Sequence, residues 1–300
     1  MAEQNYIYNL TEPFNLEKTL FCGQAFRFYK FNENSLNENF LNENSLNPNS
    51  LNQNIFCGVV NNRFLKIEQQ KNQLIFYNTT KEEFLNFWYY YFDFNNNYLN
   101  ILQKMQNNRT LNDIAKSEQG IKILNQNPFE TLISFIISQN NNIPRITKII
   151  NSFCKNFGEK IKAENNTELY AFPTPESLKN ITLEDLSVIR SGFRAKYILS
   201  AIEKINSKEI VLEDLKYGKT DYLSAKEKLM TIKGVGPKVA NCVLLFSLNF
   251  KCAFPEDVWI KRAVARLFPN GLPQEIMPYA GIVQQYIFNY ARKNPQIFKD

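Results

Sequence analysis

The residues with the clearest chemical potential lie in one short stretch, Gly234-Val235-Gly236-Pro237-Lys238. Two glycines around a small apolar residue let the backbone approach a phosphate closely, and Pro237 suits the first position of a following helix. The amides at the N-terminus of that helix would direct partial positive charge toward the phosphate. A tight turn between two helices, without any ligand, is the alternative interpretation of Gly234 and Gly236.

Lys238 falls in the first turn of the expected helix, where the helix dipole disfavours a cation. Helix stability therefore does not explain a lysine at this position. Partial burial there would favour a neutral amine, which is the form that an imine-forming lysine requires. The alternative is an ordinary lysine on the solvated surface.

Asp257 follows Phe254-Pro255-Glu256 and opens another apolar segment. At that place an aspartate is expected to be the N-cap of a helix. Helix amides would also hold the carboxylate ionised and rigid, so that it could stabilise a cationic transition state. Both roles are compatible with one side chain.

Composition narrows the chemistry that the chain can use. Histidine is absent, which excludes Ser-His and Cys-His nucleophile pairs. The five cysteines are widely spaced and contain no C-x-x-C pair, which argues against a disulfide framework, a zinc site or an iron-sulfur cluster. The formal net charge of +6 is compatible with a polyanionic partner but does not demonstrate one.

The N-terminal part of the chain has the pattern of an antiparallel sheet. Strand-like runs are Ala25–Tyr29, Ile55–Val60, Phe64–Ile67 and Leu74–Tyr77, separated by short polar links. Between the first two, residues 32–54 form an Asn-rich repeat with one leucine in five residues, which predicts a disordered insertion. We therefore expect residues 1–100 to form a β domain.

The remaining chain, residues 101–300, has the spacing of a helical domain. Aromatic residues from Phe84 to Tyr91 already fall at helical spacing. A buried helix is expected over Pro128–Ser138, and further helices near 143–156, 195–206, 224–231, 237–248, 258–268 and 279–293. The spacing Ser224-x-x-Glu227 predicts a capping box for the helix before the glycine turn. Residues 224–248 then form a helix, a hairpin and a second helix.

With Asp257 nineteen residues after Lys238, this region resembles the helix-hairpin-helix, Gly/Pro-rich, Asp motif of DNA glycosylases. More narrowly it resembles the 8-oxoguanine DNA glycosylases, which combine base release with abasic-site lyase activity. Three further segments carry the resemblance, so that it extends over nearly the whole chain outside the Asn-rich repeat: Cys22–Arg27, Ser138–Arg145, and Pro278–Gly281 with Gln284 and Phe288.

The resemblance implies a role for each matching residue. Lys238 would be the Schiff-base nucleophile, and Asp257 would activate it and stabilise positive charge at the sugar. The carbonyl of Gly23 would accept the N7 hydrogen that 8-oxoguanine has and guanine lacks. Phe288 and Cys242 would sandwich the flipped base, and Gln284 would read its Watson-Crick edge. Lys238 and Cys242 are four residues apart, as are Gln284 and Phe288, so each pair shares a helix face.

The same resemblance assigns the other side of the DNA. Asn140, Arg145 and Arg194 would hold the unpaired cytosine, and Phe193 would fill the gap in the base stack. Many relatives have tyrosine in place of Phe193, and the hydroxyl is lost here. Trp259 stands where many relatives have a histidine on a phosphate, and Lys233 replaces the usual hairpin proline.

The expected fold is α+β, an antiparallel sheet packed on a helix-hairpin-helix glycosylase core. The expected partner is duplex DNA with an oxidised purine, preferably opposite cytosine. We expect a monomer that acts without metal or organic cofactor, although the hairpin carbonyls could hold a structural monovalent cation. The N-terminus lacks a signal sequence and no apolar run could span a bilayer, which favours an intracellular enzyme of the cytoplasm, nucleoid or nucleus.

Two other functions fit parts of the pattern. An alkylpurine glycosylase of the same superfamily would rely on the aspartate alone, so Lys238 argues against it. A non-catalytic DNA-binding protein could use the hairpin as a phosphate clamp, but it would leave Gly23, Gln284 and Phe288 without a purpose.

Overall fold

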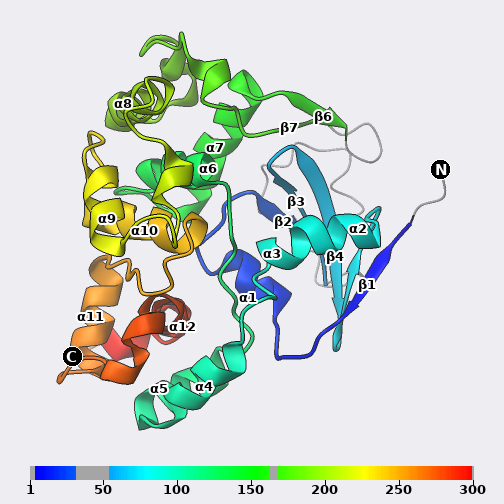
Figure 1. Ribbon diagram of the computed structural model, residues 1–300, viewed down its shortest axis with the longest axis vertical. Helices are drawn as coiled ribbons and strands as arrows, with labels where there is room; N and C mark the ends of the chain where they lie inside the picture. Colours follow the sequence, from blue (N-terminus) through cyan, green and yellow to red (C-terminus); the bar gives the residue numbers. More distant parts are fainter. Residues whose placement is uncertain (1–3, 32–53, 163–167, 299–300) are drawn as a thin grey trace.

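The computed structural model describes residues 4–31, 54–162 and 168–298, in which a five-stranded sheet adjoins a larger group of helices (Figure 1). The predicted α+β fold is therefore confirmed. The Asn-rich insertion predicted at 32–54 lies outside the described residues, apart from Asn54.

The sheet is antiparallel throughout, with the strand order β1-β5-β4-β3-β2. Its strands are β1 (Tyr6–Asn9), β2 (Phe28–Lys30), β3 (Ile55–Val60), β4 (Arg63–Gln70) and β5 (Gln73–Phe76). The predicted meander of β3, β4 and β5 is confirmed. The strand predicted over Ala25–Tyr29 begins later, at Phe28. Residues 25–27 bend away from the sheet toward the helices, and β1 was not predicted at all.

An aromatic layer covers the sheet. The chain after β5 forms α2 (Lys81–Glu83), a π-helical turn at Phe84–Trp88 and α3 (Tyr89–Tyr91), so the predicted helical spacing is confirmed with one wider turn inside it. The ring of Phe76 on β5 lies 5.0 Å from Phe84 and 6.2 Å from Trp88, measured between centroids. Burial of each large aromatic side chain stabilises such a layer by roughly 1.5–3 kcal/mol.

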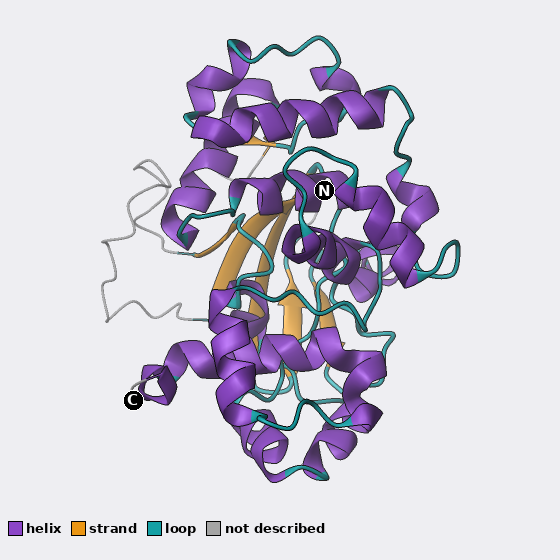
Figure 2. Cartoon of the chain, turned by 90° about the vertical axis from the view of Figure 1, so that its left-hand side faces the viewer, coloured by secondary structure: helices purple, strands orange, loops and turns teal. Residues whose placement is uncertain are grey.

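The helical part contains the site. Its α-helices, with α1 from the N-terminal part, are α1 (Leu16–Phe21), α4 (Tyr98–Gln106), α5 (Arg109–Ser117), α6 (Pro128–Ile137), α7 (Ile143–Phe157), α8 (Ala195–Asn206), α9 (Tyr222–Met230), α10 (Pro237–Ser247), α11 (Val258–Leu267) and α12 (Ala280–Lys293). Short 3-10 turns lie at Glu176–Leu178, Asp185–Ile189, Gly192–Arg194, Leu212–Leu215, Gln274–Tyr279 and Pro295–Phe298. A small hairpin of β6 (Lys160–Lys162) and β7 (Glu168–Tyr170) follows α7. Figure 2 shows these helices in front of the strands.

Two buried helices form the centre of this part. In α6 every residue except Glu130 is buried, and in α10 every residue from Val239 onward is buried. The two helices pack on each other, so the N-terminus of α10 comes to lie beside the C-terminus of α6. Among the described helices, none is long and apolar enough to cross a membrane.

Candidate active site

Helix α9, which precedes the glycine hairpin, begins about one turn earlier than the predicted capping box at Ser224. Asp221 is the N-cap of α9, and its Oδ1 accepts hydrogen bonds from the amides of Leu223 and Ser224, both at 3.0 Å. The capping box at Ser224 and Glu227 was therefore wrong. An aspartate three residues upstream satisfies the first amides of the helix, and Ser224 lies inside it.

The turn between α9 and α10 depends on Gly234. Its φ is +81°, which favours glycine, and a Cβ at this position would lie 2.3 Å from ring atoms of Tyr197. Gly236 is the N-cap of α10 in extended conformation, and a Cβ there would meet nothing within 4 Å. None of the described side chains caps α10, so its first amides are suited to bind an anion.

Lys238 extends from the first turn of α10 to the end of α6. Its Nζ donates to Ser138 Oγ at 3.4 Å and lies 4.9 Å from the centre of the Phe135 ring. Ser138 donates its own hydroxyl proton to the carbonyl of Phe135 at 2.8 Å, so its oxygen lone pairs are left for the amine. Ser138 lies in a segment that the sequence marked, but its type and spacing did not assign it this role.

Asp257 is the N-cap of α11, as predicted, with Oδ1 accepting from the amide of Ile260 at 2.8 Å. The loop before it is tied to α10, because Asn241 Nδ2 donates to the carbonyl of Phe254 at 2.8 Å. Asn241 in turn accepts a 2.8 Å hydrogen bond from the hydroxyl of Tyr222. These bonds set the distance between Asp257 and the helix that carries Lys238.

The charges of Lys238 and Asp257 both act on the thiol of Cys242. Burial raises the pKa of the Cys242 thiol to about 11, Lys238 opposes that rise and Asp257 adds to it. The thiol is therefore protonated at neutral pH and presents an uncharged, polarisable surface. Lys238, Cys242 and Asp257 are thus brought together around the N-terminal half of α10.

A second group of predicted residues meets across a long sequence separation. Gly23 has φ +84°, and a Cβ there would lie 3.2 Å from Cε1 of Phe288 on α12. Gln284, one helical turn before Phe288, is buried, and its Oε1 accepts from Gln285 Nε2 at 2.8 Å. The Phe135 ring, which faces Lys238 Nζ, also packs 5.6 Å from Phe26, three residues after Gly23, so the segment with Gly23 lies close to the lysine.

The four residues assigned to the cytosine side also cluster. Asn140 has φ +47° in the turn after α6, and Arg145 lies in the first turn of α7. Burial lowers the pKa of Arg194, and the nearby charge of Arg145 lowers it further. The guanidinium of Arg194 lies 4.5 Å from the ring centre of Phe193, whose side chain is half exposed, as an intercalating wedge requires.

Arg194 also has a structural task that the sequence did not predict. Its Nε and Nη2 donate to the carbonyl of Gln139, Nη2 also donates to Asn140 at 2.9 Å, and Nη1 donates to Ser191 at 3.1 Å. These bonds hold the turn after α6 and leave one N–H on Nη1 for another acceptor.

Trp259 stands apart from these groups. It is half exposed in the first turn of α11, and its ring packs edge-on against Phe298 at 5.1 Å.

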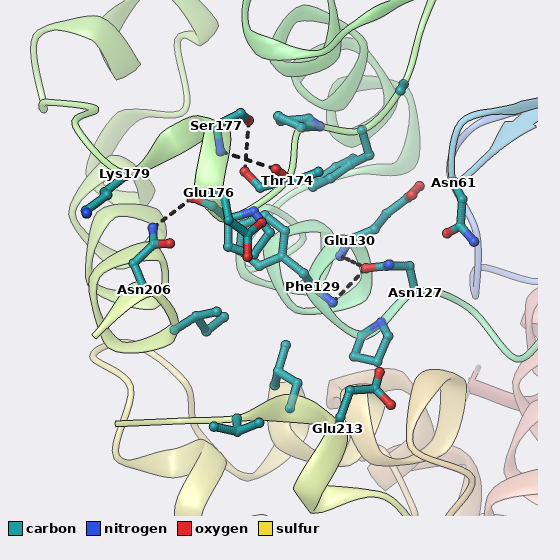
Figure 3. A pocket seen from close by; sticks show the side chains of 18 of the residues that line it. Asn61, Asn127, Phe129, Glu130, Thr174, Glu176, Ser177, Lys179, Asn206 and Glu213 are labelled. Carbon is teal, nitrogen blue, oxygen red and sulfur yellow. Dashed lines mark hydrogen bonds between the residues drawn. The ribbon is translucent and has the colours of Figure 1, made fainter. Parts of the chain in front are cut away.

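A cavity of about 950 Å³ opens elsewhere, between the start of α6, the stretch after β7 and the residues that follow α8. Figure 3 shows among its lining residues Glu130, Thr174, Glu176, Asn206 and Glu213. No residue that the sequence singled out for chemistry lines this cavity, so it is not the predicted base pocket.

Two family models match consecutive parts of the chain. Residues 7–132 match the N-terminal domain of 8-oxoguanine DNA glycosylase, and residues 133–277 match the HhH-GPD superfamily of base excision DNA repair proteins. The N-glycosylase/DNA lyase of Saccharomyces cerevisiae is 42% identical over 159 residues, which are 50% of this chain and 42% of the yeast protein. The chain thus spans less than half the length of that relative.

Solved structures match over almost the full chain. MBOgg1 in complex with a low-affinity DNA ligand has a TM-score of 0.84 and 35% identity, covering 98% of this chain and 100% of that one. The 8-oxoguanine glycosylase/lyase of Clostridium acetobutylicum, bound to duplex DNA with cytosine opposite 8-oxoguanine, has a TM-score of 0.81 and 32% identity, covering 98% and 100%. The chain therefore belongs to the HhH-GPD superfamily of base excision DNA repair proteins, within the 8-oxoguanine DNA glycosylase family.

Proposed function

We propose that this protein excises 8-oxoguanine, and related oxidised purines, from duplex DNA during base excision repair and then nicks the abasic site. The observation that carries the proposal is the setting of Lys238. Lys238 lies in the first turn of α10, directly after the glycine hairpin, and the Cys242 thiol lies close to both its amine and the capping carboxylate Asp257. Such an amine is suited to attack a sugar carbon.

The reaction uses the side chains in sequence. The hairpin amides bind a phosphate, and the base turns out of the helix at a cost of a few kcal/mol that phosphate and pocket contacts offset. Lys238 Nζ then bonds to C1′ of the deoxyribose as the bond from C1′ to the base nitrogen breaks, and the base leaves with a proton. Asp257 stabilises the positive charge on the sugar during this step.

The covalent intermediate explains the second activity. After ring opening the Lys238–C1′ bond becomes an imine, which acidifies the hydrogen on C2′. Removal of that proton breaks the C3′–O bond, so the strand is cut on the 3′ side of the lesion by β-elimination. Water then hydrolyses the imine and frees Lys238 for another cycle.

Recognition of the base relies on the second group of residues. The Gly23 carbonyl accepts the N7 hydrogen of 8-oxoguanine, and guanine is disfavoured because its N7 is itself an acceptor. Phe288 and the neutral Cys242 thiol sandwich the base, and Gln284 bonds its Watson-Crick edge. The pairing of Gly23 with Phe288 supports this arrangement.

The opposite strand is read by the cluster around Arg194. Phe193 fills the gap left by the base, while Arg145, Asn140 and the remaining Nη1 N–H of Arg194 bond to the unpaired cytosine. Adenine has only a C2–H where cytosine has its O2 acceptor, so it would leave a guanidinium N–H unpaired. This mismatch costs about 1–3 kcal/mol, roughly 5- to 150-fold in rate or affinity.

This reaction needs no metal or organic cofactor. The protein acts as a monomer inside the cell, in the compartment that contains the genomic DNA. A monovalent cation held by carbonyls of the Ile232–Gly236 turn would strengthen phosphate binding. Among the described residues no group of three or more His, Cys, Asp or Glu could hold a metal. DNA affinity in potassium and in tetramethylammonium buffers of equal ionic strength tests this site.

Single-turnover rates on duplexes with 8-oxoguanine opposite each of the four bases test the proposal. We expect excision and strand nicking, fastest opposite cytosine, and no release of unmodified guanine. Release of alkylpurines without 8-oxoguanine excision would indicate an alkylpurine glycosylase instead. DNA binding without either activity would indicate a non-catalytic protein. Equal rates opposite cytosine and adenine would overturn the roles of Arg145 and Arg194, and Arg194→Ala is expected to flatten the preference.

A further inference from the structure

Gln24 holds the turn that presents Gly23. Its side chain is buried, and Nε2 donates to the carbonyls of Thr19 and Lys122, both at 2.8 Å. At the other end of the amide, Oε1 accepts from the backbone N–H of Leu124 at 2.9 Å. Both N–H groups and the oxygen are therefore used. A flipped amide would place its oxygen against the two carbonyl oxygens and its N–H groups against the N–H of Leu124.

Apart from Thr19 of α1, the backbone that Gln24 binds belongs to the stretch between α5 and α6, here called the 118–124 segment. It is buried from Gly120 to Leu124. A second contact joins it to α1, because the amide of Lys122 donates to Thr19 Oγ1 at 3.2 Å. The turn with Gly23 is therefore attached to this segment at its residues 122 and 124.

The same segment also holds α12, which carries the other wall of the base pocket. The hydroxyl of Tyr286 donates to the carbonyl of Ile121 at 3.1 Å. The buried carboxylate of Glu118 accepts from Asn289 Nδ2 at 2.5 Å and from Lys293 Nζ at 2.8 Å. Since Asn289 directly follows Phe288, the 118–124 segment fixes both Gly23 and Phe288.

We infer that Gln24 is a positioning residue for recognition of the oxidised base. By bonding Thr19, Lys122 and Leu124 it sets where the Gly23 carbonyl points relative to Phe288. The inference rests on the proposed function, because it takes the Gly23 carbonyl as the acceptor for the N7 hydrogen. Gln24 itself touches neither the base nor Lys238 in this role.

The chemistry predicts which activity depends on Gln24. One carbonyl distinguishes 8-oxoguanine from guanine, so a shift of that oxygen by about 1 Å is expected to slow excision by about 10- to 100-fold. An abasic site has no base to recognise. Strand nicking at an abasic site needs Lys238 but not the Gly23 carbonyl, and it is expected to stay within about threefold of wild type.

Gln24→Glu and Gln24→Met are the test variants. The first keeps the size and the acceptor but loses both N–H donors, and the second keeps only the size. Gln69→Glu is the matched control: Gln69 also clamps backbone, donating to the Phe14 carbonyl at 2.7 Å and accepting from the Leu16 amide at 2.7 Å, but it does not bond the Gly23 turn.

Single-turnover excision of 8-oxoguanine opposite cytosine and nicking of an abasic site opposite cytosine are measured on all four proteins. The inference requires a selective loss of excision in both Gln24 variants and none in Gln69→Glu. Parallel loss of both activities would show that Gln24 only supports the fold, and unchanged excision would show that it has no such role. Either result overturns the inference. Wild-type protein that nicks abasic sites but does not excise 8-oxoguanine would overturn the proposed function instead.

Discussion

Two alanine substitutions in the hairpin separate its folding role from its binding role. At Gly234 an alanine would have to adopt φ +81°, which costs about 1–2 kcal/mol for a residue with a Cβ. That Cβ would also lie 2.3 Å from the ring of Tyr197, and relief of such overpacking costs about 1–3 kcal/mol. Gly234→Ala is therefore expected to lose about 2–5 kcal/mol, a large share of a typical stability of about 5–15 kcal/mol.

Gly236 is the matched control, two residues away in the same turn. Its φ of −95° and ψ of −178° suit any residue, and an added Cβ would meet nothing within 4 Å. Gly236→Ala is therefore expected to change stability by about 1 kcal/mol or less. The methyl group would, however, stand where a phosphate approaches the first amides of α10. Loss of one charged hydrogen bond costs about 1.5–3 kcal/mol, roughly 10- to 150-fold in affinity.

Thermal melts and binding to a duplex with a reduced abasic site distinguish the two effects. Gly234→Ala is expected to lower the Tm by roughly 4–20 °C, and Gly236→Ala to leave it nearly unchanged while weakening DNA binding. Unchanged affinity in Gly236→Ala would refute the assignment of the hairpin as a phosphate site. An unchanged Tm in Gly234→Ala would refute the packing of the turn on Tyr197.

Three further predictions follow from the same contacts. Deleting residues 32–54 and closing the gap with a short turn is expected to keep excision within a few-fold of wild type, because the Phe31 amide already donates to the Ile55 carbonyl at 2.9 Å; a large loss in a folded deletion variant would show that the insertion contacts DNA or the core. Asp257→Asn removes the negative charge but keeps an oxygen for the N-cap hydrogen bond. Excision rates should therefore fall severely, while the free energy of unfolding falls by no more than about 1 kcal/mol. Comparable losses of activity and stability would show that Asp257 is only an N-cap. Burial by itself raises the pKa of Glu118, but hydrogen bonds from Lys293 and Ser117 keep that pKa below its ordinary value. The ionised carboxylate therefore stabilises the fold at neutral pH, and this contribution is lost as the pH falls below about 4.5. Glu118→Gln should lower the Tm at pH 7, and the difference in Tm from wild type should shrink in acid; a difference that stays constant with pH would contradict this.

Local signals made the helices around the site predictable. Pro237 after Gly236, and Asp257 before an apolar run, are start signals that act within one helical turn. The helices expected at 237–248 and 258–268 are therefore found at Pro237–Ser247 and Val258–Leu267. The strands of the meander were equally predictable from the sequence, because short polar links separate them.

Contacts between distant residues could not be predicted in the same way. The four residues of β1 form a strand by pairing with β5, from Tyr6 opposite Phe76 to Asn9 opposite Gln73, and nothing in their own spacing indicates that partner. Arg194 and Gln24 lie in segments that the sequence marked for function. Besides a nearby carbonyl, each side chain bonds backbone 55 residues away (Gln139, for Arg194) or about 100 residues away (Lys122 and Leu124, for Gln24), so these structural roles emerge only from the fold.

Borohydride trapping tests the role of Lys238 most directly. Wild-type protein incubated with a duplex containing 8-oxoguanine opposite cytosine is expected to form a covalent adduct when the imine is reduced. Lys238→Gln is expected to form no adduct and to release almost no base, while its affinity for the duplex changes little, because phosphate contacts dominate binding and the change removes at most one cation. An adduct that persists in Lys238→Gln would place the nucleophile elsewhere and contradict the proposed mechanism.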